Sequence, residues 1–141
     1  MNLDQIEITL EPHKRGYHII TNKIESLPML STYKIGFVQI FIKHTSASLT
    51  INESSDPSVR NDFESSLNKI APENQSYYTH NDEGPDDMPA HIKTSIIGTS
   101  ITIPVTNGKL NMGIWQGIYL CEHRNNAGPR NIVITIQGDK A

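Results

Sequence analysis

The sequence predicts a β-rich α+β domain, in which strands outnumber helices and one main helix lies near the middle of the chain. Two observations carry this prediction. Short runs of alternating apolar and polar residues, separated by polar turns, recur from one end of the chain to the other. One segment, about residues 56–71, combines a helix start, a helical apolar spacing and a proline stop. At 141 residues, the chain is predicted to form a single domain, 1–141.

The first part of the chain alternates strands with a short helix. Residues 3–10 alternate apolar and polar side chains, which predicts a half-buried strand, and residues 17–20 resume a strand after a polar turn. Thr21 or Asn22 can cap a short helix, whose length Pro28 limits.

Residues 36–44 give the strongest strand signal, with apolar residues on both faces. A strand that is apolar on both faces is expected to lie in the middle of a sheet. Residues 45–48 interrupt it, and residues 49–53 are interpreted as its continuation or as its pairing partner.

The main helix is predicted from its first two residues. Asp56 is a favourable N-cap, Pro57 suits the first helical position, and Pro72 closes the segment. The apolar positions recur at helical spacing and are expected to pack on the core: Val59, Phe63, Leu67 and Ile70.

The last part of the chain is predicted to be mostly strand. The expected elements are a short helix (89–97), a strand (100–106), a returning strand (109–123), a loop (125–130) and a final strand (131–137). Asn107 and Gly108 form a favoured two-residue hairpin turn. Trp115 lies in the middle of the returning strand, which places it in the core or at a subunit interface, and Gly113 and Gly117 beside it permit a close approach of another segment.

Composition excludes several classes of protein. The net charge is −3 and no lysine or arginine cluster occurs, which argues against partners such as nucleic acid or a membrane surface. No apolar run approaches the ~20 residues of a membrane span, and the polar first residues do not form a signal peptide. The single cysteine, Cys121, excludes an internal disulfide and suits a cytoplasmic location; it is interpreted as a packed residue rather than a nucleophile. The low apolar fraction, 36%, favours a closed homo-oligomer.

The segment from His80 to His91 is the richest in residues that carry chemistry. Two histidines enclose four carboxylates: Asp82, Glu83, Asp86 and Asp87. Imidazoles bind Zn²⁺ well, and His44 would supply a third nitrogen if the fold brings it near. The carboxylates can instead bind Mg²⁺ or Ca²⁺ or act as acid and base groups. A mobile acidic loop with incidental histidines is an equal alternative.

Polar residues after the strong strand suggest an anion site. Thr45, Ser46 and Ser48, with their backbone N–H groups, can form an anion-binding nest; a bulge or strand crossover satisfied by hydroxyl groups is the alternative. Arg124 and Arg130 lie near a glycine-containing loop, as phosphate recognition requires, although loop arginines are usually solvated.

Several segments, taken in order, resemble the YjbQ-like, or secondary thiamine-phosphate synthase, family. They are His44–Glu53 (HTSASLTINE), Asp56-Pro57 with Val59 and Asp62, His80 with Gly84 and Ala90-His91-Ile92-Lys93, Gly113 with Trp115–Ile118, and Gly128–Arg130. The resemblance implies a sheet folded as a sandwich or half-barrel, assembly as a homotrimer and a polar pocket at or near the subunit interfaces.

The resemblance and the residue types together lead to a set of expected site residues. The expected catalytic residues are Glu53, His80, Gln116 and Arg130, the substrate- or phosphate-binding residues are Thr45, Ser46, Asn52 and Arg130, and the metal ligands are His44, His80 and His91. The expected cofactor is a divalent metal, Zn or Mg, with no organic cofactor, and the expected partner is a small phosphorylated metabolite.

Three functions follow as hypotheses. The first is a thiamine-phosphate-synthase-like transferase that joins a pyrimidine methyl diphosphate to a thiazole phosphate and releases pyrophosphate. The alternatives are a trimeric metal- or phospho-metabolite-binding protein without significant turnover, and a metal-dependent phosphohydrolase.

Overall fold

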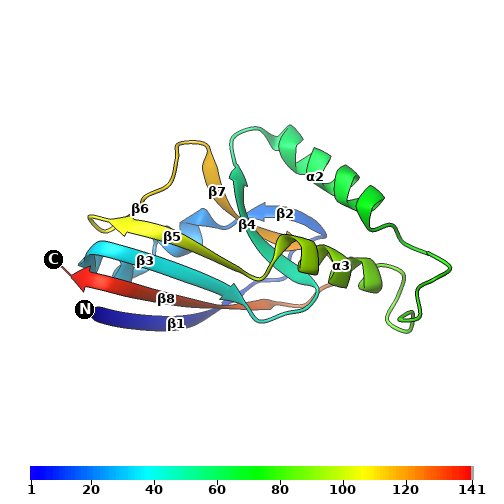
Figure 1. The fold of residues 1–141 in the computed structure, drawn as a ribbon, viewed down its shortest axis with the longest axis horizontal. Coiled ribbons are helices and arrows are strands. Elements are labelled where there is room, and N and C mark those ends of the chain that lie inside the picture. The colour runs from blue at the N-terminus through cyan, green and yellow to red at the C-terminus, as the bar shows by residue number, and fades with distance from the viewer. Residues whose placement is uncertain (141) are drawn as a thin grey trace.

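A computed structural model describes residues 1–140 as two antiparallel sheets with helices packed around them (Figure 1). The five-stranded sheet has the order β1 (Asn2–Leu10), β8 (Arg130–Lys140), β3 (Tyr33–Ile42), β5 (Ser100–Thr106) and β6 (Lys109–Leu110). The three-stranded sheet has the order β2 (Gly16–Ile19), β7 (Gln116–Glu122) and β4 (Ala47–Glu53). The helices are α1 (Thr21–Glu25), the 3₁₀ turn η1 (Pro28–Thr32), α2 (Pro57–Ile70) and α3 (Asp87–Ile97). The predicted β-rich α+β class is therefore confirmed.

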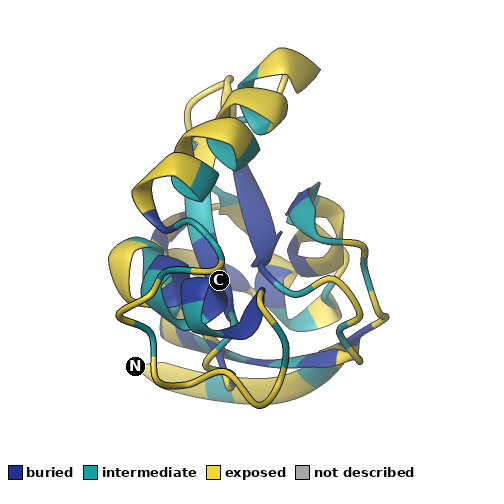
Figure 2. Ribbon diagram, turned by 90° about the vertical axis from the view of Figure 1, so that its right-hand side faces the viewer, coloured by how far each residue is buried: buried dark blue, intermediate teal, exposed yellow. Residues whose placement is uncertain are grey.

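One apolar core joins the two sheets. The inward faces of β3 and β8 contribute buried isoleucines such as Ile40 and Ile134, and the small sheet contributes Leu49, Ile118 and Leu120. The buried positions lie between the layers, and the exposed ones lie on the outer helix faces and the sheet edge (Figure 2). In the described part of the chain, no helix is long and apolar enough to cross a membrane.

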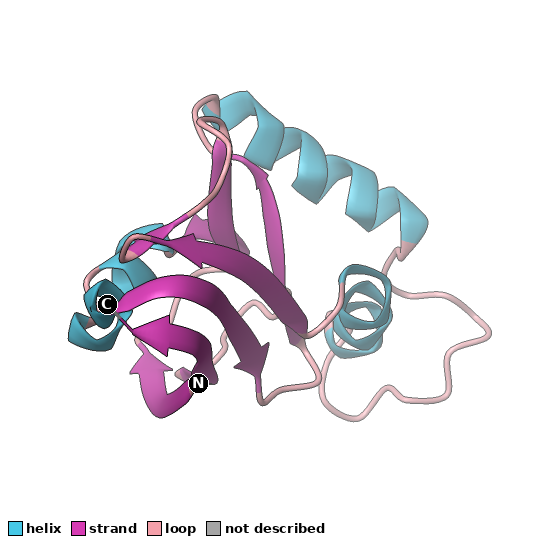
Figure 3. Cartoon of the chain, turned by 60° about the vertical axis from the view of Figure 1, so that its left-hand side comes forward, coloured by secondary structure: helices cyan, strands magenta, loops and turns pink. Residues whose placement is uncertain are grey.

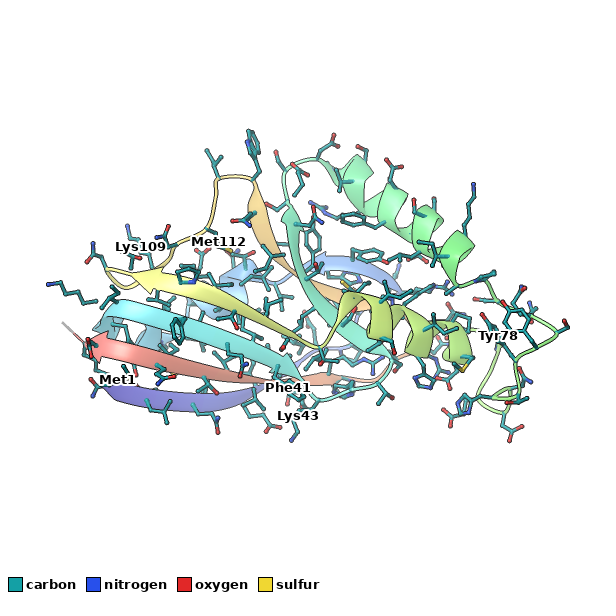
Figure 4. All side chains as sticks on the ribbon, in the orientation of Figure 1. Met1, Phe41, Lys43, Tyr78, Lys109 and Met112 are labelled. Carbon is teal, nitrogen blue, oxygen red and sulfur yellow. The ribbon has the colours of Figure 1, made fainter. Side chains whose placement is uncertain are left out.

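Strand β3 is the middle strand of its sheet, as its two apolar faces predict. Its inner face is buried, but Phe37 and Phe41 on the outer face stay exposed. Phe41 is labelled in Figure 4. At one end of β3, Gly36 faces Gly138 of β8, and a Cβ on Gly36 would lie 2.2 Å from the carbonyl oxygen of Gln137. Glycine therefore permits the close approach of these two strands.

Every connection between strands except the β5–β6 hairpin crosses from one sheet to the other, and two of these crossings change the strands that the sequence predicts. Residues 49–53 neither continue nor pair with β3; they belong to β4, which pairs with β7 in the small sheet. The returning strand ends at Leu110 and resumes only at Gln116, because residues 111–115 carry the chain from one sheet to the other. Trp115 therefore lies in a connection and is 61% exposed, so it is not in the core of the chain, and its other predicted place, a subunit interface, stays a prediction. Gly117 does permit a close approach, since a Cβ there would lie 2.5 Å from the Cβ of Ser54.

The main helix begins where its sequence predicts. The Asp56 side chain accepts a hydrogen bond from the Ser58 N–H, and Pro57 is the first helical residue. Helix α2 lies over the small sheet (Figure 3), but its apolar face is only partly buried. Phe63 and Leu67 pack against the buried pair Tyr17 and Tyr119, and no residue of α2 is fully buried.

Candidate functional site

Helix α3 and the loop before it gather His80, Asp87 and His91. Asp87 and His91 are four residues apart at the start of α3, so both lie on one face of the helix. His80 reaches the same place from the long loop that joins α2 to α3, on which Tyr78 also lies (Figure 4). One nitrogen or oxygen atom from each side chain lies within 4.8 Å of the others, and Asp87 is buried.

The Asp87 carboxylate is the centre of this cluster. Its Oδ2 lies 2.7 Å from His80 Nε2 and 3.0 Å from His91 Nε2, and its Oδ1 accepts a hydrogen bond from Arg124 at 2.6 Å. On the far side of the His91 ring, Nδ1 lies 2.8 Å from the carbonyl oxygen of Thr45. A carbonyl can only accept, so Nδ1 carries a proton.

Arg124 fixes the acidic pair at the start of α3. Its guanidinium donates to Asp86 at 2.8 Å as well as to Asp87. Burial alone would raise the pKa of Asp87, but the hydrogen bond from His80 and the charges of His91 and Arg124 hold it below its usual value. Burial also opposes ionisation of Asp86, and the backbone N–H of Asn125 together with Arg124 lowers its pKa. Both carboxylates are thus anionic at neutral pH.

His44 lies two residues after the end of β3 and outside the His80–Asp87–His91 cluster. Its Nε2 accepts a hydrogen bond from the backbone N–H of Asn131 at 2.8 Å. Burial and the nearby charge of Arg130 lower the pKa of His44, while Glu122 partly offsets them, so the ring is neutral. Metal binding by His44, His80 and His91 together stays a prediction. In the structure, His80 and His91 lie beside Asp87, and His44 does not belong to this group.

His44 and His91 nevertheless line one hollow between the end of β3 and helix α3. Its volume is about 410 Å³, and its other lining residues are Thr45, Thr94, Ser95, Gly98 and Thr99. The hollow adjoins the cluster because His91 belongs to both. It is rich in hydroxyl groups and, in its described lining, holds no lysine, arginine or carboxylate.

Arg130 is buried and forms an ion pair with Glu122. Its Nε donates to Glu122 Oε1 at 2.7 Å, a second nitrogen donates to Oε2 at 2.5 Å, and that nitrogen also lies 3.2 Å from the Ser46 carbonyl oxygen. Glu122 is 1% exposed. The guanidinium expected to bind phosphate is therefore already neutralised within the protein.

The remaining expected site residues lie at the other end of the small sheet. Glu53 is opposite Gln116 in the β4–β7 pair, whereas Ala47, next to the histidine end, is opposite Glu122. The extended strand from Ala47 to Glu53 spans roughly 20 Å. The Glu53 carboxylate accepts the N–H groups of Ser55 and Asp56. Asn52 and Gln116 also accept local backbone N–H groups. Within one chain, the predicted site residues therefore lie in two separate places.

One histidine, His123, is buried inside the protein and lies outside the His80–Asp87–His91 cluster. His123 is 1% exposed, and its Nε2 lies 2.8 Å from Ser48 Oγ. Burial, together with the charges of Lys93, Arg15 and Arg130, lowers the pKa of His123 to about 3. Nearby, burial raises the pKa of the Cys121 thiol to about 12, which fits a packed thiol rather than a nucleophile.

We expect the free energy of unfolding to fall as the pH drops below about 6.5. The His123 pKa is about 3 in the folded chain, so the unfolded chain binds more protons at intermediate pH. This difference removes roughly 3 kcal/mol between pH 6.5 and 4. Urea unfolding at both pH values measures it, and His123→Asn should flatten the profile. Equal slopes for the variant and the wild type would contradict this assignment.

The fold and the cluster define an open two-sheet α+β protein with a His–Asp–His group beside a polar hollow. The chain belongs to the YjbQ family, since the family model described as "UPF0047 protein YjbQ-like" matches residues 6–139. The UPF0047 protein YjbQ of Salmonella typhimurium is 48% identical over 136 residues, which cover 96% of this chain and 98% of that protein.

Solved structures agree on the fold. A YjbQ/UPF0047 protein from Clostridium acetobutylicum is 34% identical, covers 94% of this chain and 99% of its own, and has a TM-score of 0.83. A YbjQ-like protein of unknown function from Sulfolobus solfataricus is 24% identical and covers 98% of this chain and 99% of its own. Its TM-score of 0.86 shows likeness of fold alone.

These relatives overturn the expected function. The family and its members are described without an activity, and none of the descriptions supports thiamine-phosphate synthesis. The binding-protein and phosphohydrolase alternatives have no support from them either. The synthase hypothesis also needed Glu53 and Gln116 beside the histidines and a free Arg130, an arrangement that the chain by itself does not provide.

Proposed function

We propose that the protein is a metal-dependent enzyme whose centre is His80, Asp87 and His91. Two imidazole nitrogens and one carboxylate oxygen match the protein ligands of a catalytic zinc site, which leaves a position for water or substrate. Nitrogen ligands favour a transition metal such as Zn²⁺ over Mg²⁺ or Ca²⁺, which prefer oxygen.

One observation carries this proposal. With its Nδ1 proton given to the Thr45 carbonyl, a neutral His91 directs the lone pair of Nε2 at Asp87 Oδ2, 3.0 Å away. Two acceptors at this distance repel unless a cation lies between them. A proton or a metal ion can fill that place, and a metal ion would also use His80. Ligand atoms around tetrahedral zinc are about 3.3 Å apart, which is close to the 2.7 and 3.0 Å between Asp87 Oδ2 and the two histidine nitrogens.

The neighbours of the cluster support the same interpretation. Metal-binding histidines usually give their other N–H to a carbonyl or carboxylate, as His91 gives its own to Thr45. Arg124 holds Asp87 from the side opposite the histidines. A bound divalent metal would polarise a carbonyl oxygen or lower the pKa of a bound water to about 7.

Zinc uptake tests the proposal. After removal of metal and dialysis against buffered Zn²⁺, the wild-type protein should hold close to one zinc per chain, and His91→Ala should hold almost none. His18→Ala is the matched control, because the only hydrogen bond of the His18 side chain within residues 1–140 is to the local Lys14 carbonyl. A wild type that takes up no zinc, or a loss of zinc equal in the control, would reject the metal centre.

We also propose that the chain assembles as a homotrimer through the outer face of its large sheet. Leu3, Gln137 and Phe37 form one row across β1, β8 and β3, and Phe41 follows on the same face. The three apolar side chains are exposed, and such patches commonly mark interfaces. Sedimentation equilibrium should give the mass of three chains, and Phe37→Glu should lower it; a monomeric wild type would reject the proposal.

A further inference from the structure

The hollow beside His91 offers neutral hydrogen-bonding groups rather than charges. The backbone N–H of Asn131 donates to Nε2 of His44, so the neutral ring carries its proton on Nδ1. Nδ1 has no hydrogen-bond partner among residues 1–140. The ring is held by β3 and by the start of β8, so this donor is fixed in place before any ligand arrives.

The hydroxyl groups of the hollow add to this donor. Thr94 is 6% exposed, lines the hollow and has no hydrogen-bond partner for its Oγ1 within the described chain. Thr99 and Thr45 also line the hollow. These hydroxyls can donate or accept, so they adapt to a ligand of either kind.

Charge decides which ligand fits. Arg130 and Lys43 are the two cations whose charges act on His44. Arg130 is bound on two nitrogens by the buried Glu122, and Lys43 is paired with Glu7. A phosphate entering the hollow would lose its hydration without gaining a free cationic side chain, which is costly. An uncharged carbonyl group loses much less hydration and accepts one good hydrogen bond.

We infer that this hollow binds an uncharged carbonyl compound, of the ester or amide class, whose oxygen accepts the Nδ1–H of His44. Its role as the substrate pocket of the metal centre rests on the proposed function, whereas the binding itself does not. The class differs from the phosphorylated metabolite that the family resemblance led us to expect.

Three probes of similar size and different charge test the inference: acetamide, acetate and methyl phosphate. Long-range ¹H–¹⁵N spectra of the metal-free protein report the protonated nitrogen of each histidine. We expect the Nδ1–H form for His44 and a saturable shift of its signals with acetamide, with much smaller shifts for the two anions. Tighter binding of either anion, or an acetamide titration that leaves the hollow unshifted, would overturn the inference.

Two variants localise the site. His44→Leu should weaken acetamide binding roughly tenfold, the effect of one lost hydrogen bond, read from the Thr94 amide signal. Thr99→Val removes a hydroxyl of the hollow and keeps the inference testable if His44→Leu does not fold; His18→Leu is the control. Unchanged binding in both hollow variants would also overturn it. Because these titrations need no metal, failure of zinc uptake would remove the proposed enzyme without removing the carbonyl site.

Discussion

Asp87→Asn is expected to lower the affinity for Zn²⁺ by at least roughly 100-fold. The substitution keeps the size of the side chain and removes the anion that lies between the two histidines. Asp87 is the only buried member of the cluster, so its orientation is fixed by the protein, and Arg124 holds it from behind. A neutral amide oxygen in the same place is a much weaker ligand for a divalent cation.

Competition with a chromophoric chelator at pH 7.5 measures this loss. Asp82→Asn is the matched control, because Asp82 lies on the same acidic segment, is exposed and has no side-chain hydrogen bond in the described chain. Thermal unfolding of both metal-free variants separates loss of a ligand from loss of the fold. Wild-type affinity in Asp87→Asn would remove Asp87 from the centre.

Glu122→Gln is expected to lower the free energy of unfolding by about 3–5 kcal/mol, the usual cost of breaking a buried ion pair. Glu122 and Arg130 are both buried, and two hydrogen bonds join them. Without the carboxylate, the guanidinium keeps its charge in an interior where no other anion reaches it through a hydrogen bond among residues 1–140.

Urea unfolding at pH 7 tests this expectation. The control is Glu7→Gln, since Glu7 and Lys43 form a pair that is about half exposed on both sides, and such pairs contribute ~1 kcal/mol or less. Replacing the buried pair together, with Glu122→Leu and Arg130→Met, should recover most of the loss. A Glu122→Gln protein within 1 kcal/mol of the wild type would show that Arg130 is not tied to Glu122 and is free for a ligand.

The strands and the main helix could be predicted because their signals are local. Alternation in residues 3–10 and 36–44, and the Asp56-Pro57 start of α2, depend only on neighbouring residues. Which sheet a strand joins is not a local property. A strand crossover at 45–48 was therefore predicted only as an alternative, and the crossing at 111–115, with the exposed position of Trp115, was not predicted.

The candidate site was predictable to the same extent. His80 and His91 are close in sequence, and their segment was recognised as rich in ligand groups. Asp87 was one of four carboxylates in that segment, and only the start of α3 selects it, by placing it one turn before His91. Arg124 reaches Asp86 and Asp87 from 37 residues or more along the chain, and no sequence signal predicts that contact. Glu53 and Gln116 were grouped with the histidines because the family resemblance implied one pocket, and no sequence signal shows that β4 carries Glu53 away from the histidine end.

The most direct test of the metal centre is X-ray absorption at the zinc edge of the zinc-loaded protein. The proposal predicts two imidazole ligands and light oxygen ligands at about 2.0–2.2 Å, with one imidazole signal lost in His80→Ala. A spectrum with sulfur at about 2.3 Å, or one unchanged by His80→Ala, would contradict the assignment of zinc to His80, Asp87 and His91.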